Sequence, residues 1–235
     1  MTMNDGSRLI DNLQSVRGRI ADAARRSGRS PDAVKLVAVT KYVGVEIARR
    51  LVEAGCRDLG EARPQALWQK AEALADEPIG WHLIGHLQRN KVARTLPLAR
   101  LIHSGDSLRL IAAIEAEAAG AALVPVPLLI EVNVSGDASK HGFRPDELDA
   151  LGEQLRQCRH VAVTGLMCMA GREGDLESAR RDFEALRRLR DRLRSVWPAA
   201  IAVDDLSMGM SGDFEVAIEE GATIVRVGSA LFEGT

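Results

Sequence analysis

Aromatic residues are scarce in this chain of 235 residues: they make up 3% of it, and Tyr42 is the one tyrosine. A core must therefore be built from Ala, Val, Leu and Ile, which agrees with a hydrophobic fraction of 46%. The three cysteines, Cys56, Cys158 and Cys168, show no CxxC or CxxH spacing, and the five histidines are scattered singly. These patterns argue against a disulfide framework and a structural zinc site, so we expect reduced, mostly buried thiols and assign no metal.

Long apolar runs and strong net charge are also lacking. No run approaches the ~20 residues of a membrane-spanning helix, and the opening MTMNDGSRLIDNLQ has no basic segment followed by an apolar one. The 31 basic residues nearly balance the 33 acidic ones, which leaves a formal charge of −2. We therefore expect a cytoplasmic protein that binds neither membranes nor nucleic acids. The charged fraction of 27% is ordinary and excludes a disordered chain.

Short apolar segments alternate with amphipathic ones along the chain. Eight segments have the composition of buried strands: Val34–Thr40, Asp58–Gly60, Trp81–Ile84, Leu101–His103, Leu128–Val134, Val163–Cys168, Asp205–Met208 and Thr223–Val227. Helical spacing and turn residues predict one helix before the first strand and one after each of the first seven, at Ser7–Arg26, Val45–Ala54, Arg63–Ala75, Leu87–Thr95, Ser107–Ala119, Pro145–Cys158, Leu176–Val196 and Gly212–Glu220.

This alternation predicts an α/β fold, a (β/α)₈ barrel. No linker, repeat or low-complexity segment interrupts the chain, so we expect a single domain over residues 1–235. The chain stops soon after the eighth strand, and the extra N-terminal helix is expected to cover part of the gap left by a closing helix. A doubly wound open sheet is the alternative, but no GxGxxG follows the first strand, which disfavours its dinucleotide-binding form.

Function in such a barrel lies where the strands end. Lys41 directly follows the first strand and would point into the barrel mouth. Most lysines are solvated surface charges. The mouth of a barrel can instead desolvate an amine, and desolvation favours the neutral form that attacks an aldehyde. Lys41 is therefore a candidate for a covalent link to a carbonyl compound.

The last two strands end in small and hydroxyl-bearing residues. Loops after strands seven and eight are the recurrent phosphate site of barrels, where backbone N–H groups and a helix N-terminus bind the anion and glycine permits its close approach. Tight turns and helix capping explain the same residues without a ligand. The candidates in these segments are Ser207, Ser211, Arg226, Gly228 and Ser229.

A lysine after strand one and a phosphate site after strands seven and eight, at the same barrel mouth, suggest pyridoxal 5′-phosphate (PLP). We call this predicted phosphate site the phosphate cradle. Arg226 could pair with the phosphate or face the pyridine nitrogen, where it would keep that nitrogen unprotonated and weaken the ring as an electron sink. We also include His82, Asn133 and Met167 as candidate cofactor contacts. The alternatives are a core histidine, a structural polar network at the mouth and side-chain packing, respectively.

Seven segments in order also carry a family resemblance. They are LVAVTK (36–41), DLGEAR (58–63), WHLIGHLQRNK (81–91), IEVNVSGDASKHGF (130–143), VTGLMCMA (163–170), LSMGMSGDFEVAI (206–218) and TIVRVGSALFE (223–233). In these segments the chain resembles the pyridoxal phosphate homeostasis protein family, of the YggS/PROSC type.

The resemblance implies an alanine-racemase-like barrel without the second, β-rich domain of the racemase. It implies a cytosolic and usually monomeric carrier or regulator of vitamin B6, with no established reaction. It further implies that Lys41 holds PLP as a Schiff base and that the phosphate site is formed by the segments of Ser207, Ser211, Arg226, Gly228 and Ser229. The family commonly reads GEN after strand two, whereas this chain has Ala62 in place of the asparagine, so one polar contact to the ring is missing.

Two functions remain open. The first is a non-catalytic carrier that buffers PLP or delivers it, with PLP-dependent apo-enzymes as partners. The second is a weak PLP-dependent amino-acid racemase, which needs acid–base groups on both faces of the substrate carbon. Lys41 could be one, but Tyr42 is next to it and is expected to point away, which leaves His82 or Cys168. A cofactor face open to water favours the carrier. Lys140 is either a second transfer site or a solvated loop residue.

Overall fold

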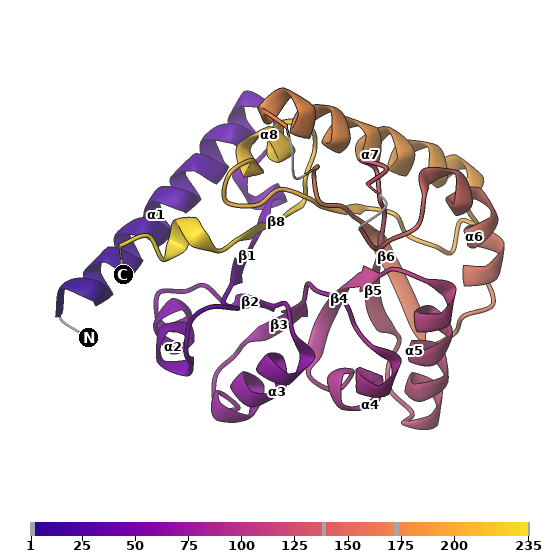
Figure 1. Ribbon diagram of the computed structural model, residues 1–235, viewed down its shortest axis with the longest axis horizontal. Helices are drawn as coiled ribbons and strands as arrows, with labels where there is room; N and C mark the ends of the chain where they lie inside the picture. Colours follow the sequence, from indigo (N-terminus) through magenta and orange to yellow (C-terminus); the bar gives the residue numbers. More distant parts are fainter. Residues whose placement is uncertain (1–2, 138–139, 172–173, 235) are drawn as a thin grey trace.

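The computed structural model describes residues 3–137, 140–171 and 174–234. Eight parallel strands follow one another around a closed barrel, and β8 pairs with β1 to complete it (Figure 1). The predicted (β/α)₈ barrel is confirmed, and the open-sheet alternative is wrong. The strands are β1 (Lys35–Val39), β2 (Asp58–Glu61), β3 (Gly80–Leu83), β4 (Ala99–Gly105), β5 (Val126–Glu131), β6 (Val161–Met167), β7 (Asp205–Ser207) and β8 (Ile224–Val227).

Helices cover the outside of the barrel. They are α1 (Met3–Arg26), α2 (Val45–Glu53), α3 (Pro64–Ala73), α4 (Val92–Thr95), α5 (Leu108–Gly120), α6 (Leu148–Leu155), α7 (Leu176–Val196) and α8 (Phe214–Glu219). Short 3₁₀ turns lie at η1 (Pro31–Ala33), η2 (Arg89–Lys91), η3 (Pro145–Glu147) and η4 (Ser229–Leu231). The helices predicted at 87–95 and 145–158 are thus each split into a 3₁₀ turn and a shorter helix. Pro97 supplies no N–H to continue α4.

Two apolar layers hold the barrel together. Strand residues on the inner side form a separate buried cluster of Val37, Leu101, Leu129, Met167 and Ile224. A larger cluster packs the outer faces of the strands against the helices. Because side chains alternate along a strand, the inward position of Ile224 also directs Arg226 of β8 into the barrel.

The N-terminal helix packs where the chain ends, as the sequence predicts. Leu9, Leu13 and Val16 are buried on one face of α1, and α1 lies alongside α8 and the C-terminal turn (Figure 1). Asn12 Nδ2 donates hydrogen bonds to the carbonyl oxygens of Leu231 and Glu233, at 3.2 and 3.0 Å. Helix α1 therefore covers the segment that follows β8.

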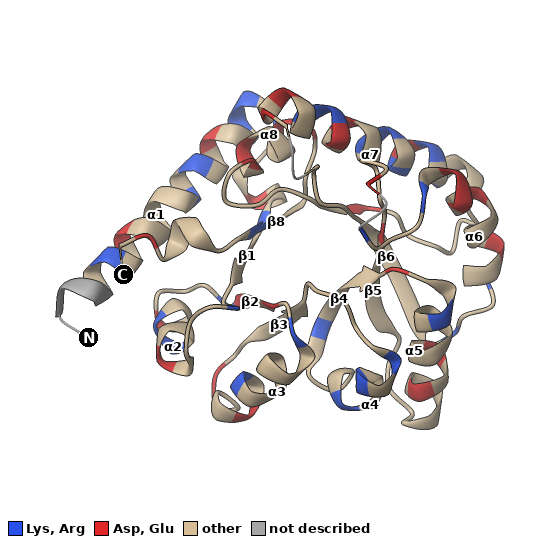
Figure 2. Cartoon of the chain, viewed as in Figure 1, with Lys and Arg blue, Asp and Glu red and all other residues tan. Residues whose placement is uncertain are grey.

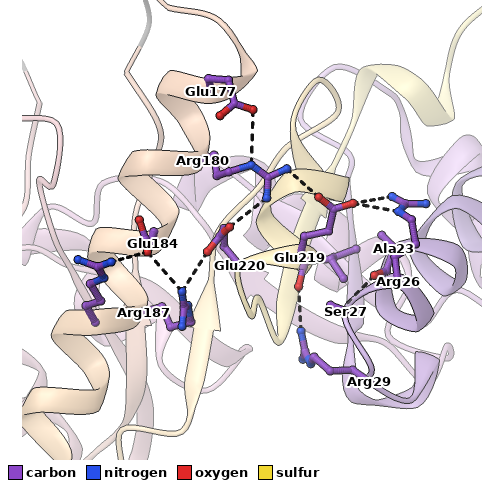
Figure 3. A network of polar contacts seen from close by, with 12 residues as sticks. Ala23, Arg26, Ser27, Arg29, Glu177, Arg180, Glu184, Arg187, Glu219 and Glu220 are labelled. Atoms are coloured by element: carbon purple, nitrogen blue, oxygen red, sulfur yellow. Dashed lines mark hydrogen bonds and ion pairs between the residues drawn. The ribbon is translucent and has the colours of Figure 1, made fainter.

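A network of ion pairs joins α1 and α7 to α8 (Figure 3). Glu219 accepts hydrogen bonds from Arg26 and Arg180, both at 2.8 Å. Glu220 pairs with Arg180 at 3.0 Å and with Arg187 at 3.2 Å. Shared carboxylates of this kind stabilise a fold more than isolated surface pairs do.

Charges elsewhere are mixed in sign. Basic and acidic residues alternate over the outer helices, including the long α7 (Figure 2). The chain therefore offers no single-sign field along this helix. Within the described residues, no helix combines the length and the apolar composition needed to cross a bilayer.

Candidate functional site

Lys41 lies at the carboxyl end of β1, at the barrel mouth, as expected. Its side chain is exposed, so the expected desolvation of the amine is wrong for the chain alone. Its Nζ lies 4.9 Å from the centroid of the Tyr42 ring, and Tyr42 therefore does not point away from the lysine. A cation against the face of a tyrosine is attracted by the ring quadrupole. The amine is accessible to a carbonyl compound from solvent.

A buried polar cluster fixes the residue before Lys41. Thr40 Oγ1 donates a hydrogen bond to Glu61 Oε1 at 2.7 Å. Lys70 Nζ from α3 donates to the same carboxylate and, at 2.7 Å, to the carbonyl oxygen of Thr40. Glu61 is fully buried, and its Oε2 has no hydrogen-bond partner among the described residues. Because a buried carboxylate is stable only when paired, this cluster holds the backbone from which Lys41 projects.

Ala62, at the end of β2, leaves the neighbouring backbone little room. A Cβ on Gly85 would lie 2.2 Å from the Ala62 carbonyl oxygen. The loops after β2 and β3 therefore touch through their backbones, and only glycine fits at position 85. Position 62 supplies no polar side chain, and the loss of a contact to the ring that the family resemblance implies stays a prediction.

The phosphate-site candidates after β7 and β8 do converge. Ser211 Oγ accepts hydrogen bonds from the backbone N–H groups of Gly228, at 3.1 Å, and Ala230, at 3.3 Å. Ser229, between them, is exposed and begins the turn η4. Two amide donors aimed at one oxygen are an arrangement that suits a phosphate oxygen as well as a hydroxyl.

Arg226 and Ser207 lie together inside the mouth. Arg226 is 4% exposed and donates from Nη1 to Ser207 Oγ at 2.6 Å and from Nη2 to the Cys168 carbonyl oxygen at 2.9 Å. Burial lowers the pKa of Arg226, but a guanidinium remains charged at neutral pH. These two bonds use two of its five N–H donors. The side chain is thus held rigidly with donors left for a ligand.

His82 does not line the mouth. It is fully buried in β3 and belongs to a chain of hydrogen bonds that begins at Ser207. Ser207 Oγ lies 2.8 Å from His103 Nδ1, and His103 Nε2 lies 2.9 Å from His82 Nδ1. His82 Nε2 lies 2.9 Å from Asp58 Oδ1, near the opposite end of the barrel. The contact of His82 with a cofactor stays a prediction; the structure gives it partners of its own.

The charged groups at the two ends of this series of hydrogen bonds, Asp58 and Arg226, determine which nitrogen or oxygen atom carries each proton. Asp58 is an acceptor, so His82 carries its proton on Nε2 and accepts at Nδ1. His103 then donates from Nε2 and accepts at Nδ1 the proton of Ser207, whose oxygen accepts from Arg226. Burial lowers the pKa of both histidines, that of His103 far below its usual value, so both are neutral. This series of hydrogen bonds orients the Ser207 hydroxyl group toward Arg226.

Met167 and Asn133 belong to other strand ends than the phosphate-site candidates of β7 and β8. Met167, the last residue of β6, packs in the inner apolar cluster and is 1% exposed. Asn133 lies just after β5, where its Nδ2 donates to the Asp137 carbonyl oxygen at 2.7 Å. Ser135 Oγ in turn donates to Asn133 Oδ1 at 3.3 Å. Contacts of Met167 and Asn133 with a cofactor stay predictions.

Lys140 is anchored rather than solvated. Its Nζ donates to Ser135 Oγ and to the carbonyl oxygens of Met169 and Ala170, at 3.1, 3.1 and 2.8 Å. It thereby ties the loop after β5 to the loop after β6. Residues 138 and 139 of the same predicted loop lie outside the described residues.

Glu131, at the end of β5, has a strongly perturbed carboxyl group. It is 6% exposed, and burial, with a contribution from the charge of Asp106, raises its pKa from 4.5 to about 7. Arg226 and His86 oppose this rise. Glu131 is not among the site residues predicted from the sequence. Its inward position two residues before Asn133 is the signal that marks it.

The pKa of Glu131 predicts a pH dependence of stability. Between pH 4.5 and about 7 the folded protein keeps a proton that the unfolded chain releases, so the free energy of unfolding falls as pH rises through this window. Glu131→Gln is expected to remove this fall, which amounts to as much as about 3 kcal/mol. Urea unfolding of both proteins at pH 4.5, 6 and 8 measures it. Parallel pH profiles for the two proteins would contradict the assignment.

Comparisons with known proteins show the family to which the chain belongs. Residues 12–235 match the family described as "Alanine racemase, N-terminal domain". The pyridoxal phosphate homeostasis protein of Aquifex aeolicus is 42% identical over 222 residues, which cover 94% of this chain and 96% of that protein. The chain belongs to the pyridoxal phosphate homeostasis protein family. The member of this family from Pseudomonas aeruginosa is 39% identical and covers 96% of this chain, with 95% of its own length matched.

Solved structures extend the family assignment to three dimensions. PipY of Synechococcus elongatus, solved with PLP bound, superposes with a TM-score of 0.84 at 30% identity and covers 95% of this chain and 99% of its own. A protein of unknown function from Bifidobacterium adolescentis superposes with a TM-score of 0.92 at 36% identity and covers 99% of this chain and 97% of its own. The family and the alanine-racemase-like fold predicted from the sequence are thus confirmed.

Several site residues escape sequence reasoning. Asp58 and Glu61 of β2, Lys70 of α3 and His103 of β4 are identified by the polar contacts that they make inside the fold rather than by a motif. Their common signal is a polar side chain within or against an otherwise apolar strand. Partners for such groups are set by the closure of the barrel, which brings β2, β3, β4 and β7 together.

Proposed function

We propose that this chain binds PLP at the barrel mouth, holds it through a Schiff base on Lys41, and buffers or delivers it without catalysing a reaction of its own. The observation that carries the proposal is the joint position of the amide pair at Ser211 and the buried Arg226, at the strand ends that also present Lys41. The PLP-bound PipY structure supports it, because that protein shares the fold over nearly its whole length.

The residues present fit the chemistry of this cofactor. Backbone N–H groups of Gly228 and Ala230 supply the donors that a phosphate needs. When bound, PLP supplies an aldehyde for an amine and an electron-withdrawing ring. Arg226 cannot give up a proton at neutral pH. We infer that it faces the pyridine nitrogen and leaves that nitrogen unprotonated, which disfavours carbanion chemistry.

Neither Cys168 nor His82, the two candidates for the second acid of a racemase, is suited to that role. Cys168 is fully buried, and burial raises the pKa of its thiol to about 12. Both ring nitrogens of His82 are already hydrogen-bonded within the barrel. Neither group can deliver a proton to a substrate at the mouth. The relatives, too, are named as homeostasis proteins.

Exchange of the α-proton of L-alanine in deuterated water tests this conclusion. The PLP-loaded protein is expected to exchange no faster than the same concentration of free PLP, because an unprotonated pyridine nitrogen facing Arg226 weakens the ring as an electron sink. NMR of the alanine Cα–H signal measures the rate. Exchange above free PLP that disappears in Lys41→Ala would show a catalyst and contradict the carrier function.

Delivery to an apo-enzyme is part of the same proposal. Exposed apolar side chains of Tyr42, Met169 and Met210 follow β1, β6 and β7 at the mouth, and they suit a transient protein contact. We propose a monomer that works in the cytoplasm, where its free thiols at positions 56, 158 and 168 would stay reduced.

A further inference from the structure

Two histidines and an aspartate meet at the rim of the barrel, on the side away from the phosphate cradle. His86 follows β3, Asp106 follows β4 and His141 lies after β5. One possible ligand atom from each lies within 4.8 Å of the other two. The imidazole rings of His86 and His141 stack, with centroids 4.7 Å apart and an angle of 18° between their planes. Three separate loops thus direct donor atoms to one point.

The three side chains form a partly prepared site. His86 Nδ1 lies 2.6 Å from Asp106 Oδ2, and Asp106 Oδ1 accepts a hydrogen bond from Ser107 Oγ at 3.0 Å. The Asp106 side chain is 5% exposed, whereas both histidines are exposed. A buried, oriented carboxylate with two accessible imidazoles is typical of metal sites, where hydrogen bonds from neighbouring groups orient the ligands.

The electrostatic surroundings also favour a cation. The carboxyl group of Glu131 is buried near Asp106 and forms no hydrogen bond with the described residues. A divalent ion at the rim would lower the cost of both carboxylates.

The geometry points to a divalent transition-metal site formed by His86, Asp106 and His141, with Zn²⁺ as the matching ion. Imidazole and carboxylate together suit Zn²⁺, Co²⁺ and Ni²⁺, whereas Mg²⁺ and Ca²⁺ take oxygen ligands. Three protein ligands leave a fourth position open. The site borders a cleft of about 530 Å³ that is also lined by Arg89 and Arg109, so a water or a small oxygen anion would complete the coordination.

Only small movements are needed to admit the ion. Bonds of about 2.0–2.2 Å to nitrogen and oxygen in a tetrahedron separate the two ligand atoms by roughly 3.3 Å. The His86–Asp106 pair must therefore open by less than about 1 Å, and for Nδ1 to bind the ion the ring proton of His86 must lie on Nε2. The exposed histidines can make this adjustment without disturbing the barrel. The proposal of this metal site does not depend on whether the chain binds PLP.

Metal titration of the purified chain tests the proposal. After dialysis against a chelator and then against buffer, Zn²⁺ is expected to bind with one equivalent by calorimetry, and Co²⁺ to give the visible absorbance of a site with nitrogen ligands. His141→Ala and Asp106→Asn are each expected to weaken Zn²⁺ binding more than about 100-fold, since each removes a direct ligand. Circular dichroism establishes that both variants are folded.

His160→Ala is the matched control. His160 also pairs with a carboxylate, that of Glu115, at 3.0 Å, but it lies at the start of β6, away from the mouth. This variant is expected to bind Zn²⁺ as the wild type does. No stoichiometric binding by the wild type would overturn the proposal. Equal affinities in wild type and His141→Ala would overturn it as well, because the ion would then lie elsewhere.

Discussion

Lys41→Ala is expected to abolish the visible absorbance band that PLP gives when it is joined to the protein, and to release PLP on dialysis. The reason is that the covalent link contributes most of the retention in a site that is open to solvent. The exposed Lys41 side chain contacts the ring of Tyr42, so its loss should change the free energy of unfolding by less than about 0.5 kcal/mol. Absorbance spectra before and after dialysis measure retention, and thermal unfolding measures stability.

Lys140→Ala provides the comparison for this variant. Lys140 is another lysine of the mouth loops, and its amine makes three hydrogen bonds. We expect it to keep the absorbance band. A band that survives in Lys41→Ala and disappears in Lys140→Ala would show that the linkage had been assigned to the wrong residue.

Arg226→Ala and Ser207→Ala are expected to weaken PLP binding by roughly 10- to 150-fold. The loss of one charge-assisted contact costs about 1.5–3 kcal/mol. Ser207 acts through Arg226, because its hydroxyl accepts from the guanidinium at 2.6 Å. Titration of each variant with PLP gives the dissociation constants.

In these variants, the effect on folding stability must be measured separately from the effect on PLP affinity. Arg226→Ala leaves the Cys168 carbonyl without its donor and opens a cavity in the barrel, so some loss of stability is expected. Arg226→Lys keeps the charge and much of the volume, and should bind PLP with an intermediate affinity. Arg181→Ala, an exposed change on α7, should behave as wild type. Wild-type affinity in both Arg226 variants and in Ser207→Ala would refute this part of the site.

The architecture can be predicted from the sequence because parallel strands buried on both faces are continuous apolar runs. Segments such as 34–40 and 163–168 are therefore easy to recognise. The contact between Ser211 and Gly228 follows from their places after the last two strands, where the sequence predicts a phosphate site but where tight turns and helix capping account for the same residue types. The position of Lys41 follows from the end of its strand.

The interior of the site could not be predicted in the same way. His82 is assigned to the cofactor from its place in a strand, yet the structure gives it His103 and Asp58 as partners. These contacts depend on the stagger between neighbouring strands, which no local pattern encodes. The exposure of Lys41 could not be predicted either, because it depends on how far the surrounding loops extend.

Peptide mapping after borohydride reduction tests the central claim most directly. The wild-type chain is loaded with one equivalent of PLP, reduced so that any Schiff base becomes a stable amine, digested and examined by mass spectrometry. The proposed function predicts one modified peptide, with the phosphopyridoxyl group on Lys41. A label on a different lysine, or spread over many lysines without preference for Lys41, would contradict it.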